Sequence, residues 1–208
     1  MQGIHMIKNL IFDFGDVFIN LDKEGAMQNA LDLFEVKELP EELVAMNALY
    51  EQGLISSEEF LEFYQENFPD LTEVEIVNAW NCILKDFPRK RLDFIQQLAA
   101  DKKYKLILLS NTNELHINWI KENVSFYEDF KNCFDSFYLS HEIQLRKPNT
   151  NIYEFVLQQN DIKAEESFFI DDTLENTEAA KQLGIHVWNI DETSQDICDI
   201  FTIKKDLF

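Results

Sequence analysis

Carboxylates follow two short apolar runs of the chain. Asp13 comes directly after the string NLIF, and Asp171 and Asp172 come after the string FFI. A carboxylate at such a place can act as a nucleophile or hold a metal ion. Taken alone, Asp13 is better explained as a turn cap, and a turn also explains one acid of the later pair. Both acids together suit a hard cation with oxygen ligands, such as Mg²⁺.

Two further segments offer groups that could bind an anion. Ser110 and Asn111 place a hydroxyl and an amide after an apolar run, followed by backbone N–H groups that suit a phosphate. The simpler explanation is an N-cap for a helix that begins near Glu114. Arg146 and Lys147 are adjacent cations in an acidic chain. Lys147 could neutralise a phosphate or orient a carboxylate, and a solvated loop pair is the alternative.

Alternating strands and helices must position these residues. Because ligands bind beyond the carboxyl ends of parallel strands, the four segments are expected at one edge of the sheet. The alternation predicts an α/β fold, a Rossmann-like parallel sheet with helices on both faces. Strands are predicted at 7–14, 104–109, 134–139, 167–170 and 185–189, with helices at 92–102, 114–122, 152–159 and 175–183.

A helical insertion separates the first strand from the others. The stretch is rich in helix-forming residues, with apolar side chains at helical spacing. Ser56 is predicted to cap one of its helices and Gly53 to end the helix before it. We therefore expect a small all-helical module at 22–90, and a core built from 1–21 and 91–208.

The composition limits the partners of the protein. The chain has 208 residues, 46% of them hydrophobic, and a net charge of −21. Such a charge repels nucleic acid and anionic membranes, so neither is an expected partner, and an anionic substrate would need a local positive site. No apolar run is long enough to span a bilayer and no signal peptide is recognisable, which predicts a cytoplasmic protein. Monomer and homodimer both stay open. No disulfide framework or zinc site is indicated by the three cysteines, Cys82, Cys133 and Cys198.

The four segments, in this order, resemble the motifs of the haloacid dehalogenase-like hydrolase superfamily. The resemblance rests on Asp13 with Gly15, on the strings LSNTN and RKP, and on the acid pair, and it covers essentially the whole chain. The helical insertion is similar to the small cap of the branch that holds sugar phosphatases. Within this branch the chain looks closest to bacterial α-glucose-1-phosphate phosphatases. The resemblance implies a phosphatase that acts on a small, sugar-phosphate-like metabolite.

The resemblance also implies roles for individual residues. Asp13 would attack the phosphoryl group and form an aspartyl-phosphate that water then hydrolyses. Mg²⁺ would be held by the Asp13 carboxylate, the Gly15 backbone carbonyl and the Asp172 carboxylate, with Asp171 supporting them from behind or through a metal-bound water. The phosphate would be held by Ser110, the backbone of Asn111 and Lys147.

One position departs from the pattern of these phosphatases. The residue two after the nucleophile is usually a second Asp that protonates the leaving group, but here it is Gly15. Asp16 stands one position later, where a side chain points elsewhere, so it is a poor substitute. The sugar-phosphatase group that the chain resembles commonly carries Gly at this position. The missing acid also leaves two alternatives: a 2-haloacid dehalogenase, whose halide leaves without a proton, and a catalytically weak binding or regulatory protein.

Substrate choice is expected to depend on the helical insertion. Its candidate lid residues are Tyr50, Glu51, Trp80 and Asn81, each of which is explained as well by helix packing. The four histidines are scattered, and none stands at metal-ligand spacing: His5, His116, His141 and His186.

Overall fold

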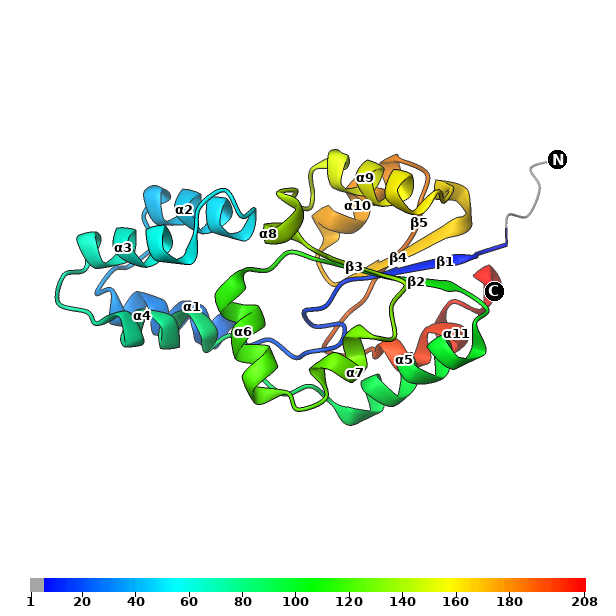
Figure 1. Ribbon diagram of the computed structural model, residues 1–208, viewed down its shortest axis with the longest axis horizontal. Helices are drawn as coiled ribbons and strands as arrows, with labels where there is room; N and C mark the ends of the chain where they lie inside the picture. The colour runs from blue at the N-terminus through cyan, green and yellow to red at the C-terminus, as the bar shows by residue number, and fades with distance from the viewer. Residues whose placement is uncertain (1–5) are drawn as a thin grey trace.

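The computed structural model describes residues 6–208; His5 and the first residues of the predicted core lie outside this range. Its centre is a sheet of five parallel strands in the order β3-β2-β1-β4-β5 (Figure 1). This order confirms the predicted Rossmann-like sheet. The strands are β1 (Asn9–Phe12), β2 (Lys105–Ser110), β3 (Ser136–Leu139), β4 (Ser167–Asp171) and β5 (His186–Asn189).

Helices cover both faces of the sheet because its strands alternate between two apolar cores. Leu10 and Phe12 of β1 face one core, and Ile11 faces the other. The first core is covered by α5 (Arg89–Asp101), α6 (Glu114–Asn123), α7 (Tyr127–Lys131) and α11 (Ile200–Ile203). The second is covered by α9 (Thr150–Asn160) and α10 (Leu174–Gln182).

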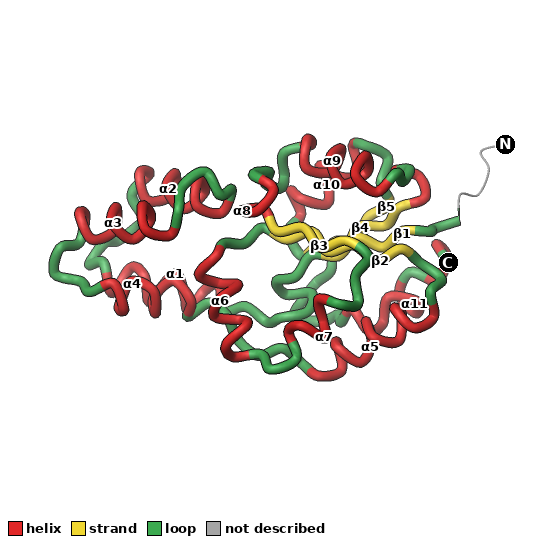
Figure 2. The backbone as a smooth tube through the Cα atoms, in the orientation of Figure 1, coloured by secondary structure: helices red, strands yellow, loops and turns green. Residues whose placement is uncertain are grey.

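A helical lobe extends from one end of the sheet (Figure 2). It contains its own apolar cluster, with Phe34, Phe60 and Tyr64 in ring contact. Ser56 caps α3 through a reciprocal pair of hydrogen bonds with Glu59, which confirms the predicted helix start. The helices of the lobe are α1 (Lys23–Leu33), α2 (Glu41–Glu51), α3 (Ser57–Asn67) and α4 (Glu73–Asn81).

The lobe contacts the core closely at the end of α2. Gly53 has a φ of 67°, and a Cβ built there would lie 2.0 Å from the backbone oxygen of His141 in α8 (Ser140–Ile143). Only glycine therefore fits this approach without strain. The Oγ of Ser140 donates a hydrogen bond to the backbone oxygen of Glu51. The end of α2 is thus anchored to the start of α8.

The structure corrects several predicted boundaries. The first strand is four residues long, not eight, because the backbone oxygen of Phe14 accepts bonds from Phe18 and Ile19 in a turn. Helices α7, α8 and α11 were absent from the predicted set. Helix α5 begins at Arg89, so the predicted boundary after residue 90 falls in its first turn; the division into two domains stays a prediction. Among residues 6–208, no helix has the length and apolar character needed to cross a membrane.

Candidate active site

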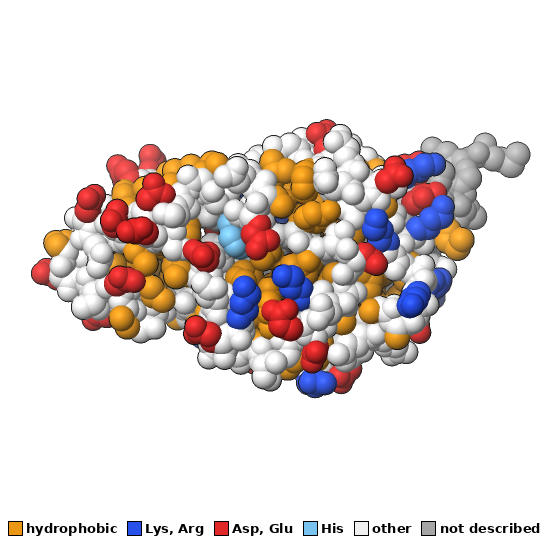
Figure 3. Space-filling view, in the orientation of Figure 1, with side chains coloured by type: hydrophobic (Ala, Val, Ile, Leu, Met, Phe, Trp, Pro, Cys, Tyr) orange, Lys and Arg blue, Asp and Glu red, His pale blue; other side chains and the backbone are white. Residues whose placement is uncertain are grey.

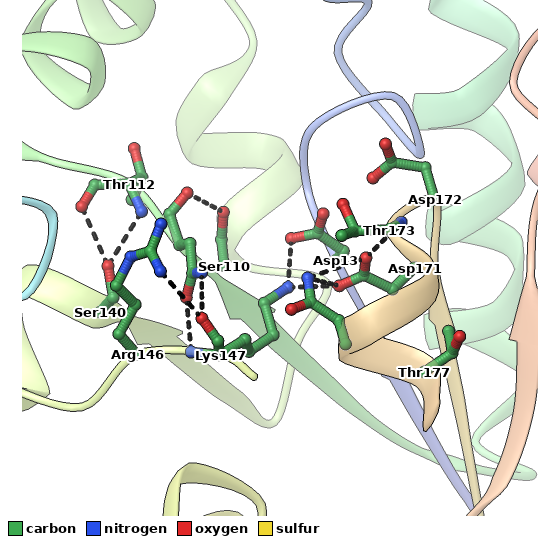
Figure 4. A network of polar contacts seen from close by, with 12 residues as sticks. Asp13, Ser110, Thr112, Ser140, Arg146, Lys147, Asp171, Asp172, Thr173 and Thr177 are labelled. Atoms are coloured by element: carbon green, nitrogen blue, oxygen red, sulfur yellow. Dashed lines mark hydrogen bonds and ion pairs between the residues drawn. The ribbon is translucent and has the colours of Figure 1, made fainter. Parts of the chain in front are cut away.

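The carboxyl ends of three neighbouring strands bring the predicted polar residues together. Asp13 follows β1, Ser110 ends β2 and Asp171 ends β4, all at the same edge of the sheet (Figure 4). The pairing of β1 with both β2 and β4 makes this edge compact. Parallel pairing therefore turns residues more than a hundred positions apart into neighbours.

Lys147 is the buried cation at the centre of this edge. Its Nζ lies 2.8 Å from Asp13 Oδ1 and 2.6 Å from Asp171 Oδ2, and its side chain is only 1% exposed (Figure 4). Burial alone would lower the pKa of Lys147, but the two carboxylates raise it above its ordinary value. Lys147 is therefore a fixed positive charge that holds both carboxylates in place.

Asn111 fixes the backbone that carries Lys147. Its side-chain Nδ2 donates to the Lys147 backbone oxygen, and its Oδ1 accepts from the Lys147 N–H, both at 2.9 Å. This amide is thus engaged with the backbone of Lys147. The Oγ of Ser110 is buried and donates to the backbone oxygen of Asn111 at 3.4 Å, and Ser110 is not among the residues that line the cavity described below.

Asp171 is oriented by the helix that follows it. Its Oδ1 accepts from the Thr173 N–H at 2.8 Å, and both of its oxygens accept from Asn176 Nδ2 at 3.1 Å. Asp13 is held less completely. Burial, and secondarily the neighbouring charges of Asp171 and Asp172, raise the pKa of Asp13 to about 7 against the opposing effect of Lys147. The surroundings of Asp13 therefore oppose its negative charge despite the contact with Lys147.

Lys23 is a site residue that the sequence analysis missed. From the first position of α1, its Nζ forms ion pairs with Asp172 and, at 2.8 Å, with Asp16 Oδ2. These two carboxylates raise the pKa of Lys23 although its partial burial opposes the shift. The only signal in the sequence was a lysine at the start of a helix in a very acidic chain. Lys23 thus joins the helical lobe to the acid pair of the core.

Asp16 and Leu21 define the surroundings of Gly15, where the usual second acid is missing. Asp16 Oδ1 accepts from the Leu21 N–H at 2.9 Å, and its other oxygen pairs with Lys23, so its carboxylate supports the turn and the start of α1. A Cβ built on Gly15 would lie 2.7 Å from Leu21 Cδ1. Leu21 therefore occupies space that a longer side chain at Gly15 would need, and Asp16 does not substitute for that side chain.

The acids of this edge fit a divalent cation. One carboxylate oxygen from each of Asp13, Asp171 and Asp172 lies within 4.8 Å of the others. Together with Asp16 they are four carboxylates facing two ammonium groups, those of Lys23 and Lys147. When all are ionised, two negative charges remain, which one divalent cation balances. Oxygen ligands are those that Mg²⁺ prefers.

A cavity of about 400 Å³ opens over these groups. Asp13, Gly15, Lys147 and Asp172 lie in its wall together with Glu51 of the helical lobe. Glu51 Oε2 lies 2.8 Å from a guanidinium nitrogen of Arg146, whose segment also carries Lys147. Both the core and the lobe therefore enclose the space in front of Asp13. Arg146 thus connects the core to the lobe.

The other candidate lid residues have packing roles. Tyr50 Oη bonds Ser57 and accepts from the Leu115 N–H, and Trp80 Nε1 donates to Asn113 Oδ1. Asn81 is buried. Among the four proposed from the sequence, Glu51 alone lines the cavity in front of Asp13.

The histidines and cysteines described by the structure form no metal cluster among residues 6–208. His116 stacks on Trp80 at a centroid distance of 5.4 Å and contacts Asn113, which makes it part of the junction between α4 and α6. The cysteines are free thiols: Cys82, Cys133 and Cys198.

Comparison with known proteins places this geometry in a family. The family model of haloacid dehalogenase-like hydrolases matches residues 7–184. A D-ribitol-5-phosphate phosphatase of Bacteroides thetaiotaomicron is 29% identical over 197 residues, 88% of this chain and 91% of that protein.

Solved structures that resemble this chain belong to the same family. A HAD family enzyme of Bacteroides thetaiotaomicron, in complex with magnesium and inorganic phosphate, is 34% identical with a TM-score of 0.82; the match covers 94% of this chain and 99% of that one. A HAD-like family hydrolase of Porphyromonas gingivalis is 28% identical with a TM-score of 0.81, covering 97% and 98%. The family expected from the sequence motifs is therefore confirmed.

Proposed function

The chain belongs to the haloacid dehalogenase-like hydrolases, and from this premise we propose that it hydrolyses small phosphomonoesters with the help of Mg²⁺. The observation that carries the proposal is the position of Lys147 Nζ between Asp13 and Asp171, in the wall of an open cavity. This arrangement presents one oriented carboxylate and a fixed positive charge to an incoming phosphate.

Asp13 is the proposed nucleophile. One carboxylate oxygen attacks phosphorus, the bond from phosphorus to the ester oxygen breaks, and the alcohol leaves while an aspartyl-phosphate forms. Water then attacks phosphorus, which releases inorganic phosphate and restores the Asp13 carboxylate. Lys147, at 2.8 Å from Asp13 Oδ1, orients the nucleophile and neutralises a phosphate oxygen. Ser110 and the backbone of Asn111 are the further proposed phosphate contacts.

The proposed Mg²⁺ ligands are the carboxylates of Asp13 and Asp172 and the backbone carbonyl of Gly15, with Asp171 supporting them. Bound there, the ion supplies positive charge to the phosphate oxygens. In the same arrangement Asp171 keeps Lys147 and Asn176 in place, because its oxygens bond both. The supporting role of Asp171 is thus exerted through these two side chains.

No carboxylate of the chain is proposed to protonate the leaving group. Leu21 stands beside Gly15, and Asp16 is bonded to the backbone of Leu21 and to Lys23. General acid catalysis typically contributes about 10²–10⁴-fold, so esters whose alcohol leaves without a proton are expected to react fastest. Water supplies the proton for poorer leaving groups.

The proposed class of substrate is based on the similar proteins. The similar enzyme of Bacteroides thetaiotaomicron is named for D-ribitol 5-phosphate, which favours a sugar-phosphate-like metabolite here. The helical lobe is the proposed cap, because Glu51 lines the cavity in front of Asp13. A cytoplasmic location is likewise proposed, and the oligomeric state is left open.

The test is phosphate release from p-nitrophenyl phosphate and a panel of sugar phosphates, with Mg²⁺ and with EDTA. We expect release only with Mg²⁺, and its loss in Asp13→Asn. The matched control is Asp161→Asn, which changes an exposed Asp at the end of α9 and should keep full activity. Turnover by Asp13→Asn would contradict the mechanism. Release of halide from 2-haloacids without any phosphate release would favour the dehalogenase alternative, and Mg²⁺ binding without turnover would favour a regulatory protein.

A further inference from the structure

A second cavity of about 320 Å³ lies inside the helical lobe. This volume is at the lower end of the roughly 300–1,000 Å³ that small-molecule sites occupy. Its wall is mostly apolar and comes from both helix pairs of the lobe, α1 with α4 and α2 with α3. The residues that matter below are Lys23, Ala30, Asn47, Glu51, Tyr64 and Trp80.

Helix α1 leaves this space open. None of its residues is buried, although Ala26 and Ala30 face the cavity. Met27 also lines the cavity, and the short side chains of Ala26 and Ala30 beside it leave this face of the helix only partly filled. An amphipathic helix with an unfilled apolar face is typical of a surface that a ligand covers.

The lobe cavity shares two wall residues with the cavity over Asp13. Lys23 and Glu51 line both. Lys23 pairs with Asp172 and Glu51 with Arg146, so each stands where the lobe meets the phosphate-binding groups. The two cavities therefore adjoin at Lys23 and Glu51, which places the lobe cavity next to the space in front of Asp13.

Most polar side chains in the wall of the lobe cavity are engaged, and the Nδ2 of Asn47 is the donor that stays available to a ligand. Tyr64 Oη donates to Asn47 Oδ1 at 2.7 Å, and Trp80 Nε1 donates to Asn113. Lys23 and Glu51 are held in ion pairs. The cavity thus offers apolar contact and few open hydrogen-bond partners, which favours an apolar group over one that must keep its bonds to water.

We propose that the lobe cavity binds an apolar leaving group, so that the protein hydrolyses phosphomonoesters of alkyl or aryl alcohols in addition to sugar phosphates. This inference rests on the proposed function, because it assigns the alcohol part of the same substrate. The acidic outer surface of the lobe (Figure 3) leaves the junction beside Lys23 and Arg146 as the approach for the anionic ester.

The test compares compounds that differ only in chain length. n-Alkylphosphonates from methyl to heptyl are assayed as inhibitors of p-nitrophenyl phosphate hydrolysis with Mg²⁺ present. Each methylene that becomes buried should lower Ki by roughly fourfold, so burial of only two of the six added methylenes should already lower Ki by more than about tenfold. A Ki that does not change with chain length would overturn the inference. Absence of p-nitrophenyl phosphate hydrolysis would instead overturn the proposed function.

Two further measurements locate the effect. Trp80 fluorescence should be quenched by heptylphosphonate, and the signal should vanish in Trp80→Phe; binding without this change would contradict occupancy of the lobe. Ala30→Leu should remove the dependence of Ki on chain length by filling the cavity. Its matched control is Ala45→Leu on the exposed side of α2, which should keep the wild-type series. An unchanged series in a folded Ala30→Leu variant would also overturn the inference.

In turnover, kcat/KM for n-heptyl phosphate should exceed that for ethyl phosphate by at least about tenfold, with most of the difference in KM. The two alcohols differ little as leaving groups, so chemistry alone predicts no such ratio. Equal values would contradict the assignment of apolar esters as substrates.

Discussion

The two regions that enclose the cavity over Asp13 are packed in opposite ways. At the sheet edge, Lys147 and Asp171 are almost completely buried. Lys147 Nζ contacts both Asp13 and Asp171, and Asp171 also accepts a hydrogen bond from Asn176. In the helical lobe, α1 has no buried residue and a cavity of about 320 Å³ separates the helix pairs. The proposed catalytic groups are thus fixed, while the lobe, which is proposed to meet the variable part of the substrate, keeps free space.

Because of this difference, a single substitution should change the free energy of unfolding more at the sheet edge than at the contacts between the lobe and the core. Removing a charge from the buried cluster leaves an opposite charge without a partner, which is costly in a region of low dielectric. Contacts between the lobe and the core are closer to solvent and are individually weaker. The variants below should therefore show a decreasing series of effects from the sheet edge to the junction.

The largest effect is expected for Lys147→Met. Loss of the ammonium group leaves Asp13 and Asp171 buried without their cation, so the free energy of unfolding should fall by about 3–5 kcal/mol. Urea unfolding in EDTA measures it without help from a divalent cation. Lys181→Met is the matched control, because that lysine is exposed and should change stability by less than about 0.5 kcal/mol. Equal stability of the two variants would refute the comparison.

A smaller effect is expected for Gly15→Asp. The added Cβ would lie 2.7 Å from Leu21 Cδ1, the end of a flexible side chain that can shift, so stability should fall by about 1 kcal/mol, the lower end of the cost of overpacking. Alkyl phosphatase activity should not rise in this variant. Adding Leu21→Ala should restore room, and any gain in rate should appear only in the double variant. A rate gain in Gly15→Asp alone, at wild-type stability, would show that Leu21 does not exclude the acid.

The junction between α4 and α6 should respond to pH. Burial lowers the pKa of His116 to about 4, below the value of about 6.5 expected in the unfolded chain. Its contribution to stability is therefore fully present above pH 6.5 and is lost as the pH falls toward 4. At pH 5.5 this loss is about 1 kcal/mol. His116→Gln should reduce the fall in unfolding free energy between pH 7.5 and 5.5 by that amount. If the unfolding free energies of His116→Gln and wild type depended on pH in the same way, the contribution assigned to His116 would be disproved.

The smallest effect is expected for the ion pair between the lobe and the core. Arg146 and Glu51 are partly exposed, with side chains 34% and 26% accessible, so their coupling energy should be about 0.2–1 kcal/mol. A double-mutant cycle of Arg146→Met and Glu51→Gln in urea unfolding measures it. High salt should reduce the coupling further. A coupling as large as the effect of Lys147→Met would remove the distinction between the two regions.

Much of the sheet edge was predictable from the sequence because it depends on local patterns. Apolar runs that end in Asp13 or Asp171 predict strands with polar ends, and parallel strands place those ends together. Lys147 Nζ bonds both carboxylates, and its role as an orienting cation in the reaction stays a prediction. Strand limits were less accurate, because the turn after β1 depends on backbone bonds between residues close in sequence rather than on apolar character.

Contacts between the lobe and the core were not predictable in this way. Lys23 reaches Asp172 only because the turn after β1 directs the first residue of α1 back to the sheet edge. Leu21 blocks Gly15 through the same turn, and Asn176 reaches Asp171 from α10. None of these pairs has a spacing that a motif specifies.

The sequence by itself determined the fold class and the family, and it predicted the carboxylates and the lysine that the structure brings together at the sheet edge. These follow from the period of apolar side chains and from short motifs, which are local properties of the chain. Only the tertiary structure decided which lobe residues line the cavities, and that Asp16 supports a turn. Those outcomes depend on how helices of similar amphipathic character pack against one another, and the free volume between them is set by several side chains at once.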